Sequence, residues 1–372
     1  MPNLSDKGVY LPPSPIRKLV PYAEKAKSRG IKVYHLNIGQ PDICTPQVAV
    51  DAVKNISDHV FEYGHSAGNE SYRRKLVKYY ESVGIDVTAD DLMITVGGSE
   101  AIFMAMTICL NPGDEVLVPE PFYANYNGFA MEAGVNIKPI SSTIANDFAL
   151  PPMEDFERLI TPRTKAILIC NPNNPTGRLI ADDLLEEILR ICREKNIALF
   201  VDECFLSLSD GGVDLTPSLS DFPQLFILKA FTKSFGMAGL RLGYGLSADE
   251  ALLRKMSAAV PPWNVSTLAQ AAGVAALGDA EFLEKNRTII RAERPWLEEK
   301  LRKFGFRVCP SQVNYILFRG DVGLTEQLRA RGVAIRDCAN FEGLTSGWYR
   351  VAVRQYEENE QLIAAIRSVG KE

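Results

Sequence analysis

A repeated alternation of short apolar runs, turn residues and helix-length segments between Leu92 and Leu246 constrains the fold of this chain most strongly. The runs are strand-length and apolar almost throughout, which is typical of strands buried on both faces of a mostly parallel sheet. They are Leu92–Val96, Glu115–Pro119, Ala166–Cys170, Ile197–Val201, Leu225–Leu228 and Leu242–Leu246. Helical patterns lie between them, so the sequence predicts an α/β fold with helices on both faces of the sheet.

The two ends of the chain predict a second, smaller unit. A chain of 372 residues favours two domains, because one hydrophobic core rarely grows that large. The expected elements at the ends are a polar helix around 18–29, a strand over 31–38, strands over 314–318, 333–336 and 348–353, and helices over 324–331 and 357–369. A helix expected over 46–59 begins the larger unit. We therefore expect a large domain over residues 46–280 and a small α+β domain built from residues 1–45 and 281–372.

Composition excludes several classes of function. The net charge of −5 argues against a nucleic-acid surface, and no apolar stretch is long enough to span a membrane. The seven cysteines are widely spaced without a Cys-x-x-Cys pair, and the N-terminus lacks an apolar signal core, so we expect a cytoplasmic protein with reduced thiols. None of the three histidines stands in metal-ligand spacing, which argues against a metal site.

The stretch from Ala230 to Tyr244 carries the first sign of chemistry. Lys233 comes just after the apolar run 225–228, and Arg241 follows eight positions later among glycines and small residues. A lysine in a partly desolvated pocket beside other cations becomes a usable amine nucleophile, and an arginine can clamp a phosphate. A phosphorylated aldehyde cofactor needs both groups, and pyridoxal phosphate is the usual one. A surface lysine and arginine flanking a glycine-rich loop remain the alternative for this stretch alone.

The ends of the other predicted strands carry polar and aromatic residues where parallel sheets hold ligands. The turn 97–101 precedes a helix expected over 102–110, which makes an anion site or simply a turn. Asp202, at the end of a buried strand, suits a partner for a protonated ring nitrogen. An aromatic ring in the segment 120–126 could stack on a planar cofactor, although core packing is the stronger interpretation for Tyr126.

Taken together, these loops resemble the class I and II aminotransferases among the fold-type I pyridoxal-phosphate enzymes, over nearly the whole chain. The resemblance rests on Asn171-Pro-Asn-Asn-Pro-Thr-Gly177, on Asp202 at its strand end, and on Thr232-Lys-Ser with Gly239-Leu-Arg241, all in the family's order and spacing. It implies a large domain with a seven-stranded, mostly parallel sheet between helices, and a small α+β domain.

The resemblance also implies roles for individual residues. Lys233 would form an aldimine with the cofactor and transfer the α-proton, and Asp202 would hold the ring nitrogen protonated. Tyr123 would stack on the ring and Asn174 would donate a hydrogen bond to its phenolic oxygen. The remaining cofactor-binding residues would be Gly98, Ser99, Thr232 and Arg241 at the phosphate, Glu100 beside them, and Tyr63 reaching from the neighbouring subunit of a homodimer.

For the substrate, the resemblance implies Gly39 and Arg350 at the carboxylate, with Asn174 beside them. In relatives that take phosphorylated substrates, a second small-domain arginine matches Arg336, for which a solvated surface residue is the alternative. Two positions depart from the family's pattern. Phe205 stands where a tyrosine is common, and Ala230 where serine or threonine is common; both changes should retune the cofactor and weaken its binding.

The two parts of the chain point to different relatives. Residues 11–130 resemble aspartate-type aminotransferases, whereas the part from Asp202 onward resembles threonine-phosphate decarboxylase and histidinol-phosphate aminotransferase. The first hypothesis is therefore an aminotransferase that moves an amino group from an aspartate-like L-amino acid to a 2-oxo acid. The second is a decarboxylase of an O-phosphorylated amino acid or a histidinol-phosphate aminotransferase. A binding protein built on an inactive domain of this kind is a third.

Overall fold

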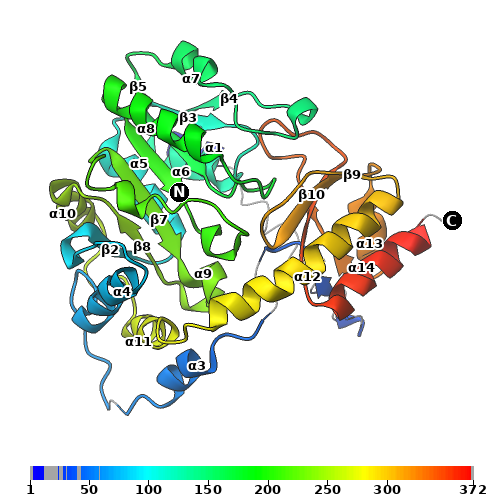
Figure 1. Cartoon of the computed structure of the whole chain (residues 1–372), viewed down its shortest axis with the longest axis horizontal. Helices are drawn as coiled ribbons and strands as arrows, with labels where there is room; N and C mark the ends of the chain where they lie inside the picture. The colour runs from blue at the N-terminus through cyan, green and yellow to red at the C-terminus, as the bar shows by residue number, and fades with distance from the viewer. Residues whose placement is uncertain are drawn as a thin grey trace.

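A seven-stranded sheet forms the centre of the larger part of the molecule (Figure 1). The computed structural model describes residues 3–11, 24, 28–30, 32–39, 43–57 and 59–369. The strands, in spatial order, are β2 (Leu92–Thr95), β8 (Gly243–Leu246), β7 (Leu225–Ala230), β6 (Ala198–Asp202), β5 (Thr164–Cys170), β3 (Glu115–Pro119) and β4 (Asn136–Ile140). Only β8 runs antiparallel to its neighbours in this sheet. The predicted mostly parallel sheet is confirmed.

Helices cover both faces of this sheet, as expected for strands that are apolar on both sides. One face packs on α5 (Gly98–Cys109), α6 (Asn125–Ala133) and α10 (Glu250–Ala259). The other face packs on α4 (Glu70–Ser82), α7 (Met153–Leu159), α8 (Asp182–Lys195) and α11 (Thr267–Ala276), and α3 (Gln47–Lys54) lies against α11. Because side chains alternate along a strand, Phe200 of β6 joins the first face and Leu199 and Val201 join the second.

A four-stranded antiparallel sheet forms the centre of the smaller part. Its order is β12 (Arg336–Asp337), β13 (Trp348–Ala352), β10 (Tyr315–Arg319) and β9 (Arg307–Val308). Helices α13 (Leu324–Ala330) and α14 (Tyr356–Val369) bury apolar side chains against it, together with the C-terminal half of α12 (Phe282–Lys303). Figure 1 shows α12 running from the seven-stranded sheet towards the four-stranded one. Among the described residues, no helix is both long and apolar enough to cross a membrane.

Short elements complete the chain. Helices α1 (Asp6–Tyr10) and α9 (Phe231–Ser234) are brief, and 3-10 turns lie at Ala89–Asp91, Ile144–Asn146, Leu206–Leu208, Thr216–Ser218 and Ala238–Leu240. Strand β1 (Tyr34–His35) pairs in parallel with β11 (Val333–Ala334) in a separate two-stranded sheet. The helix predicted around residues 18–29 lies almost entirely outside the described residues.

Several sequence expectations differ from the structure. Among the described residues, the strand expected over 31–38 is only Tyr34–His35, and the helix expected over 46–59 is Gln47–Lys54. The strand predicted over 333–336 is two strands, because β11 pairs with β1 whereas β12 pairs with β13. The helix expected from residue 102 already begins at Gly98, so the glycine turn itself forms its first turn. Strand β4 was not predicted, because Asn136-Ile-Lys-Pro-Ile140 lacks a continuous apolar run; as an edge strand with one neighbour, it tolerates Pro139 and half-exposed side chains.

Candidate active site

Lys233 lies in α9, directly after the carboxyl end of β7, and its side chain is partly buried. The pKa of its amine is lowered to about 8, first by burial and then by the nearby guanidinium groups of Arg350 and Arg241. Cys204 and Asp202 oppose this fall only in part. Its Nζ lies 5.3 Å from the centre of the Phe205 ring. The amine therefore exists in appreciable amounts in its neutral, nucleophilic form near pH 8.

Asp202 ends β6, the neighbouring strand, and holds its carboxylate with two hydrogen bonds. The Tyr126 hydroxyl donates to Oδ2 at 2.7 Å, and the backbone N–H of Cys204 donates to Oδ1 at 3.0 Å. Both donors are neutral groups that orient the carboxylate towards the space beyond the strand ends. The Tyr126 ring is buried, as expected. The hydrogen bond from its hydroxyl to Asp202 was not predicted from the sequence.

Tyr123 lies beside Tyr126, with the two rings edge to face at 5.4 Å between centres. Its hydroxyl accepts a hydrogen bond from Asn125 Nδ2 at 2.7 Å. Burial raises the pKa of the Tyr123 phenol, while the positive charge of Arg350 partly opposes the rise. The phenol therefore stays neutral, and its ring is held by a hydrogen bond at the carboxyl end of β3.

The glycine turn before α5 makes a cradle that side chains would fill. Gly97 has a φ of 76°, and a Cβ there would come within 2.9 Å of the Arg241 guanidinium. A Cβ on Gly98 would come within 2.7 Å of the Cys204 sulfur. Arg241 itself has a left-handed φ of 58° and donates to the Ala238 carbonyl at 3.1 Å. A helix N-terminus and a guanidinium thus meet at one point, which is the chemistry of a phosphate site.

Glu100, Ser99 and Thr232 surround this cradle in different ways. The Glu100 carboxylate accepts hydrogen bonds from Val96 N–H at 2.8 Å and from Asn264 Nδ2 at 2.7 Å. It therefore ties the turn to the segment 262–266, and Asn264 is a residue that sequence analysis did not single out. Ser99 is exposed in the first turn of α5, and Thr232 is half-buried next to Lys233.

Arg350 brings the four-stranded sheet to the loop after β5. Its Nη1 donates to Asn174 Oδ1 at 2.5 Å, and its guanidinium lies 5.1 Å from the centre of the Tyr315 ring. The loop that holds Asn174 is fixed by Tyr315, whose hydroxyl donates to the Asn173 carbonyl at 2.8 Å. Gly39 joins the same region, since its carbonyl accepts a hydrogen bond from Asn314 Nδ2 at 3.3 Å.

Arg336 is buried, with 6% of its surface exposed, so the solvated alternative is wrong. It lies directly opposite Arg350 in the register of β12 and β13. Its Nη2 donates to Asn340 Oδ1 at 2.8 Å, and burial lowers the pKa of the guanidinium, with Arg350 adding to that effect. Among the described residues, the hydrogen bonds of these two guanidinium groups go to neutral acceptors, Asn340, Asn174 and the Asn37 carbonyl, so the pair favours an anion nearby.

Tyr63 lies outside this cluster within one chain. Its ring stacks on Trp263 at 4.5 Å between centres, and it is 80% exposed. Trp263 precedes Asn264, whose amide donates to Glu100, so within one chain Tyr63 lies on the Glu100 side of the site without entering it.

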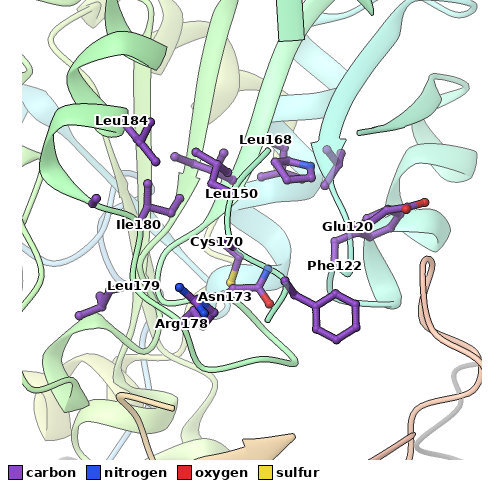
Figure 2. A pocket seen from close by; sticks show the side chains of 16 residues that line it. Glu120, Phe122, Leu150, Leu168, Cys170, Asn173, Arg178, Leu179, Ile180 and Leu184 are labelled. Atoms are coloured by element: carbon purple, nitrogen blue, oxygen red, sulfur yellow. The ribbon is translucent and has the colours of Figure 1, made fainter. Parts of the chain in front are cut away.

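A separate cavity of about 120 Å³ lies behind the loop 171–177 (Figure 2). Apolar side chains from β3, β5 and the segments 148–150 and 179–184 line most of it, with Glu120 and Arg178 as its charged residues. Neither Lys233 nor Asp202 belongs to its lining. The chemistry therefore lies at the strand ends around Lys233 and not in this cavity.

The residues at the strand ends fit a phosphorylated aldehyde cofactor. A glycine cradle meets Arg241, an amine with a lowered pKa follows β7, and a carboxylate held by two neutral donors ends β6. These are the three groups that pyridoxal phosphate needs. The fold and the site define a pyridoxal-phosphate enzyme of fold type I.

Comparisons with known proteins agree. Residues 31–366 match the family described as aminotransferase class I and II, and the chain belongs to this family. It is 33% identical to threonine-phosphate decarboxylase of Salmonella typhimurium, over 76% of this chain and 78% of that one. It is 35% identical to histidinol-phosphate aminotransferase of Methanosarcina mazei, over 69% and 68% of the two chains.

The fold is similar to that of aspartate aminotransferase from Thermus thermophilus with maleate, with a TM-score of 0.89 at 27% identity over 99% of this chain and all of the other. The resemblance inferred from the sequence is therefore confirmed, and pyridoxal phosphate is the cofactor.

Proposed function

We propose that this enzyme is an aminotransferase that takes the amino group of an aspartate-like L-amino acid and passes it to a 2-oxo acid. The observation that carries the proposal is the hydrogen bond from Arg350 to Asn174. It holds a guanidinium from the four-stranded sheet near Lys233. A guanidinium binds a carboxylate bidentately, so this arrangement orients an amino acid by its α-carboxylate.

The residues around Lys233 would divide the chemistry. Pyridoxal phosphate, when bound, supplies an electron sink for the pair left at the substrate's α-carbon. Lys233 would hold the cofactor. Once the substrate has released it, its Nζ would accept the substrate's α-proton and donate it to another atom of the bound substrate and cofactor. Asp202 would keep the ring nitrogen protonated, supported by Tyr126, and Tyr123 would cover one face of the ring.

The glycine cradle would bind the cofactor's phosphate. Gly98 and Ser99 would offer backbone N–H groups at the start of α5, with the hydroxyl of Thr232 and the guanidinium of Arg241 on the other side. Glu100 would act by holding the turn in place through Val96 and Asn264. Among these residues, Arg241 would supply most of the charge.

The substrate would lie between the two sheets. Asn174 would donate to the cofactor's phenolic oxygen while its own oxygen accepts from Arg350, and Gly39 would close over the substrate carboxylate. Arg336, buried beside Arg350, would bind a second anionic group at the far end of the substrate. A dianionic donor such as aspartate satisfies both arginines.

A phosphorylated substrate is a second candidate. It is supported by the burial of Arg336 and by the similarity to enzymes named threonine-phosphate decarboxylase and histidinol-phosphate aminotransferase. In a decarboxylase the bond to the substrate carboxylate would break, CO₂ would leave, and Lys233 would return a proton to the α-carbon. In a histidinol-phosphate aminotransferase, the phosphate would take the place of the carboxylate as the anchoring anion.

We further propose a homodimer in the cytoplasm, with each chain divided into domains at residues 46–280 and at 1–45 with 281–372. Exposed apolar side chains beside the site support the dimer: Phe61 is 67% exposed and Trp263 50%. Tyr63 would then reach the phosphate in the neighbouring subunit. The seven cysteines, none in a disulfide, suit a reducing compartment.

The test is a panel of single substrates mixed with the purified, cofactor-loaded enzyme. The panel contains aspartate, glutamate, alanine, an aromatic amino acid, histidinol phosphate and O-phosphothreonine, with the visible absorbance of the bound cofactor, 2-oxo acid and CO₂ measured together. Loss of visible absorbance with stoichiometric 2-oxo acid and no CO₂ from aspartate supports the proposal. Steady CO₂ release from O-phosphothreonine contradicts it in favour of the decarboxylase.

A further inference from the structure

A buried charged cluster lies on the far side of the sheet from Asp202. Glu203 follows Asp202 directly, and the alternation of side chains along the chain sends the two carboxylates to opposite faces. The Lys229 ammonium lies 2.9 Å from Glu203 Oε2 and 2.5 Å from Asp214 Oδ2. Glu203 has 3% of its surface exposed, and the cluster borders a cavity of about 170 Å³ with Tyr80 and Tyr244.

The two carboxylates stand at the two ends of one loop. Glu203 begins it, and its Oε1 accepts a hydrogen bond from Leu215 N–H at 3.1 Å. Asp214 ends it, and its Oδ1 accepts hydrogen bonds from the N–H and hydroxyl of Thr216. Because both carboxylates form ion pairs with the same ammonium, Lys229 holds the loop 203–214 against the end of β7.

This loop joins the cofactor face to the long helix α12. Phe205, near its start, lies 5.3 Å from Lys233 Nζ and 5.0 Å from the ring centre of Tyr315. Asp210, near its middle, forms ion pairs with Arg291 at 2.7 Å and Arg294 at 2.5 Å, both in α12. A change in the position of the loop would therefore reach both the Lys233 amine and the helix that leads to the four-stranded sheet.

We propose that Lys229, closing the loop through Glu203 and Asp214, is a positioning residue that holds Phe205 against Lys233 and so keeps the cofactor-binding amine shielded from water. The proposal rests on the proposed function, because it assigns the cofactor to Lys233. Loosening the loop lets water reach the Lys233 nitrogen, and hydration favours its charged form. The protonation midpoint at this nitrogen then rises.

The experiment compares four variants with the unchanged, cofactor-loaded protein. Lys229→Met removes the ammonium, and Asp214→Asn is a milder change at a side chain that is one-third exposed. Lys229→Arg restores the positive charge. Glu115→Gln is the matched control, because Glu115 is also buried and paired, with Arg163 and Lys138, but lies at the amino end of β3. The readouts are the pH midpoint of the cofactor's visible absorbance, its dissociation constant, and the unfolding temperature without cofactor.

We expect Asp214→Asn and Lys229→Met to raise the midpoint by about half a pH unit or more. Both should weaken cofactor binding by about tenfold. Lys229→Arg should return the midpoint towards that of the unchanged protein, and Glu115→Gln should lower the unfolding temperature alone. An unchanged midpoint in Asp214→Asn, with only a lower unfolding temperature, overturns the proposal.

The unchanged protein separates this result from a failure of the proposed function. If it develops no visible absorbance with pyridoxal phosphate, the assignment of the cofactor to Lys233 fails, and the positioning role fails with it. If it does so but transaminates no amino acid in the panel, the substrate proposal fails while the midpoints still decide the role of Lys229.

Discussion

Lys229 and Lys233 stand four positions apart at the end of one strand, yet their surroundings give them opposite properties. Burial opposes the charge of both amines. Around Lys229, the carboxylates of Glu203 and Asp214 outweigh burial and hold the pKa well above its ordinary value. Around Lys233, Arg350 and Arg241 act in the same direction as burial, and the pKa falls to about 8. The sign of the neighbouring charges, and not burial alone, therefore decides whether the pKa of a buried lysine rises or falls.

The largest effect expected from this comparison is the loss of Lys233. Lys233→Ala removes both the amine that holds the cofactor and the group that moves the α-proton, so turnover should fall by about 10³- to 10⁴-fold. Its unfolding temperature at pH 7 should not fall, because the change removes a buried amine that lies beside two cations. Turnover with the best donor of the panel and thermal unfolding without cofactor check both statements. Near-normal turnover in this variant would break the comparison.

The neighbouring carboxylates of Asp202 and Glu203 allow a second test of the comparison between the surroundings of Lys229 and Lys233. Asp202→Asn removes the charge offered to the ring nitrogen, and turnover should fall by about 10²-fold or more. Glu203→Gln should cost less than about tenfold, because Glu203 lies on the opposite face of the sheet from Asp202 and a glutamine can still accept the hydrogen bond from Leu215 N–H. Single-turnover rates with a saturating donor measure both. Equal losses would contradict the assignment of the two carboxylates to separate tasks on opposite faces of the sheet.

The loss of Arg350 and the loss of Arg336 should affect KM for different sets of substrates. Arg350→Ala should raise KM by about 10²-fold for every amino acid, since each carries an α-carboxylate. Arg336→Ala should raise KM by about tenfold for dianionic donors and leave it unchanged for alanine. A panel of KM values with kcat measured alongside decides this. An equal effect of Arg336→Ala on the KM values for alanine and aspartate would contradict a second anion site at Arg336.

The comparison also predicts a pH dependence that Lys229 cannot produce. The folded pKa of Lys233 lies below the ordinary value of about 10.5, so its amine is protonated below about pH 8 and neutral above it. The rate constant for capture of pyridoxal phosphate should therefore rise about tenfold per pH unit up to about pH 8 and then level off. Stopped-flow absorbance over pH 6 to 10 measures it. A rise that continues to pH 10 would show an unshifted lysine.

Local patterns predicted the parts of the fold that depend on local sequence. Strands β3, β5, β6 and β7 were predicted within a few residues, because strands buried on both faces are apolar throughout. Strand β4 was not, since an edge strand with Asn136 and Lys138 has no such pattern. The split between β11 and β12 depends on which partners the chain meets, and no local signal reports that.

The sequence could propose the candidate site as a set of residues but not as a set of contacts. The order and spacing of Asn174, Asp202, Lys233 and Arg241 carried the family resemblance, which the comparisons confirm. The hydroxyl of Tyr126 on Asp202 and the guanidinium of Arg350 on Asn174 join positions 76 and 176 residues apart. Such contacts appear only once the chain is folded. The available signal was a tyrosine, and not a phenylalanine, at a position expected to lie in the core, because a buried hydroxyl usually has a hydrogen-bond partner.

The central claim is that the cofactor binds to Lys233, and the most direct measurement is to fix it there chemically. The loaded protein is reduced with borohydride, digested, and the modified lysine located by mass spectrometry. We predict that the phosphopyridoxyl group is found on Lys233 and that Lys229, in the neighbouring peptide, is unmodified. Modification of Lys229, or labelling spread over surface lysines with Lys233 unmodified, would contradict the account.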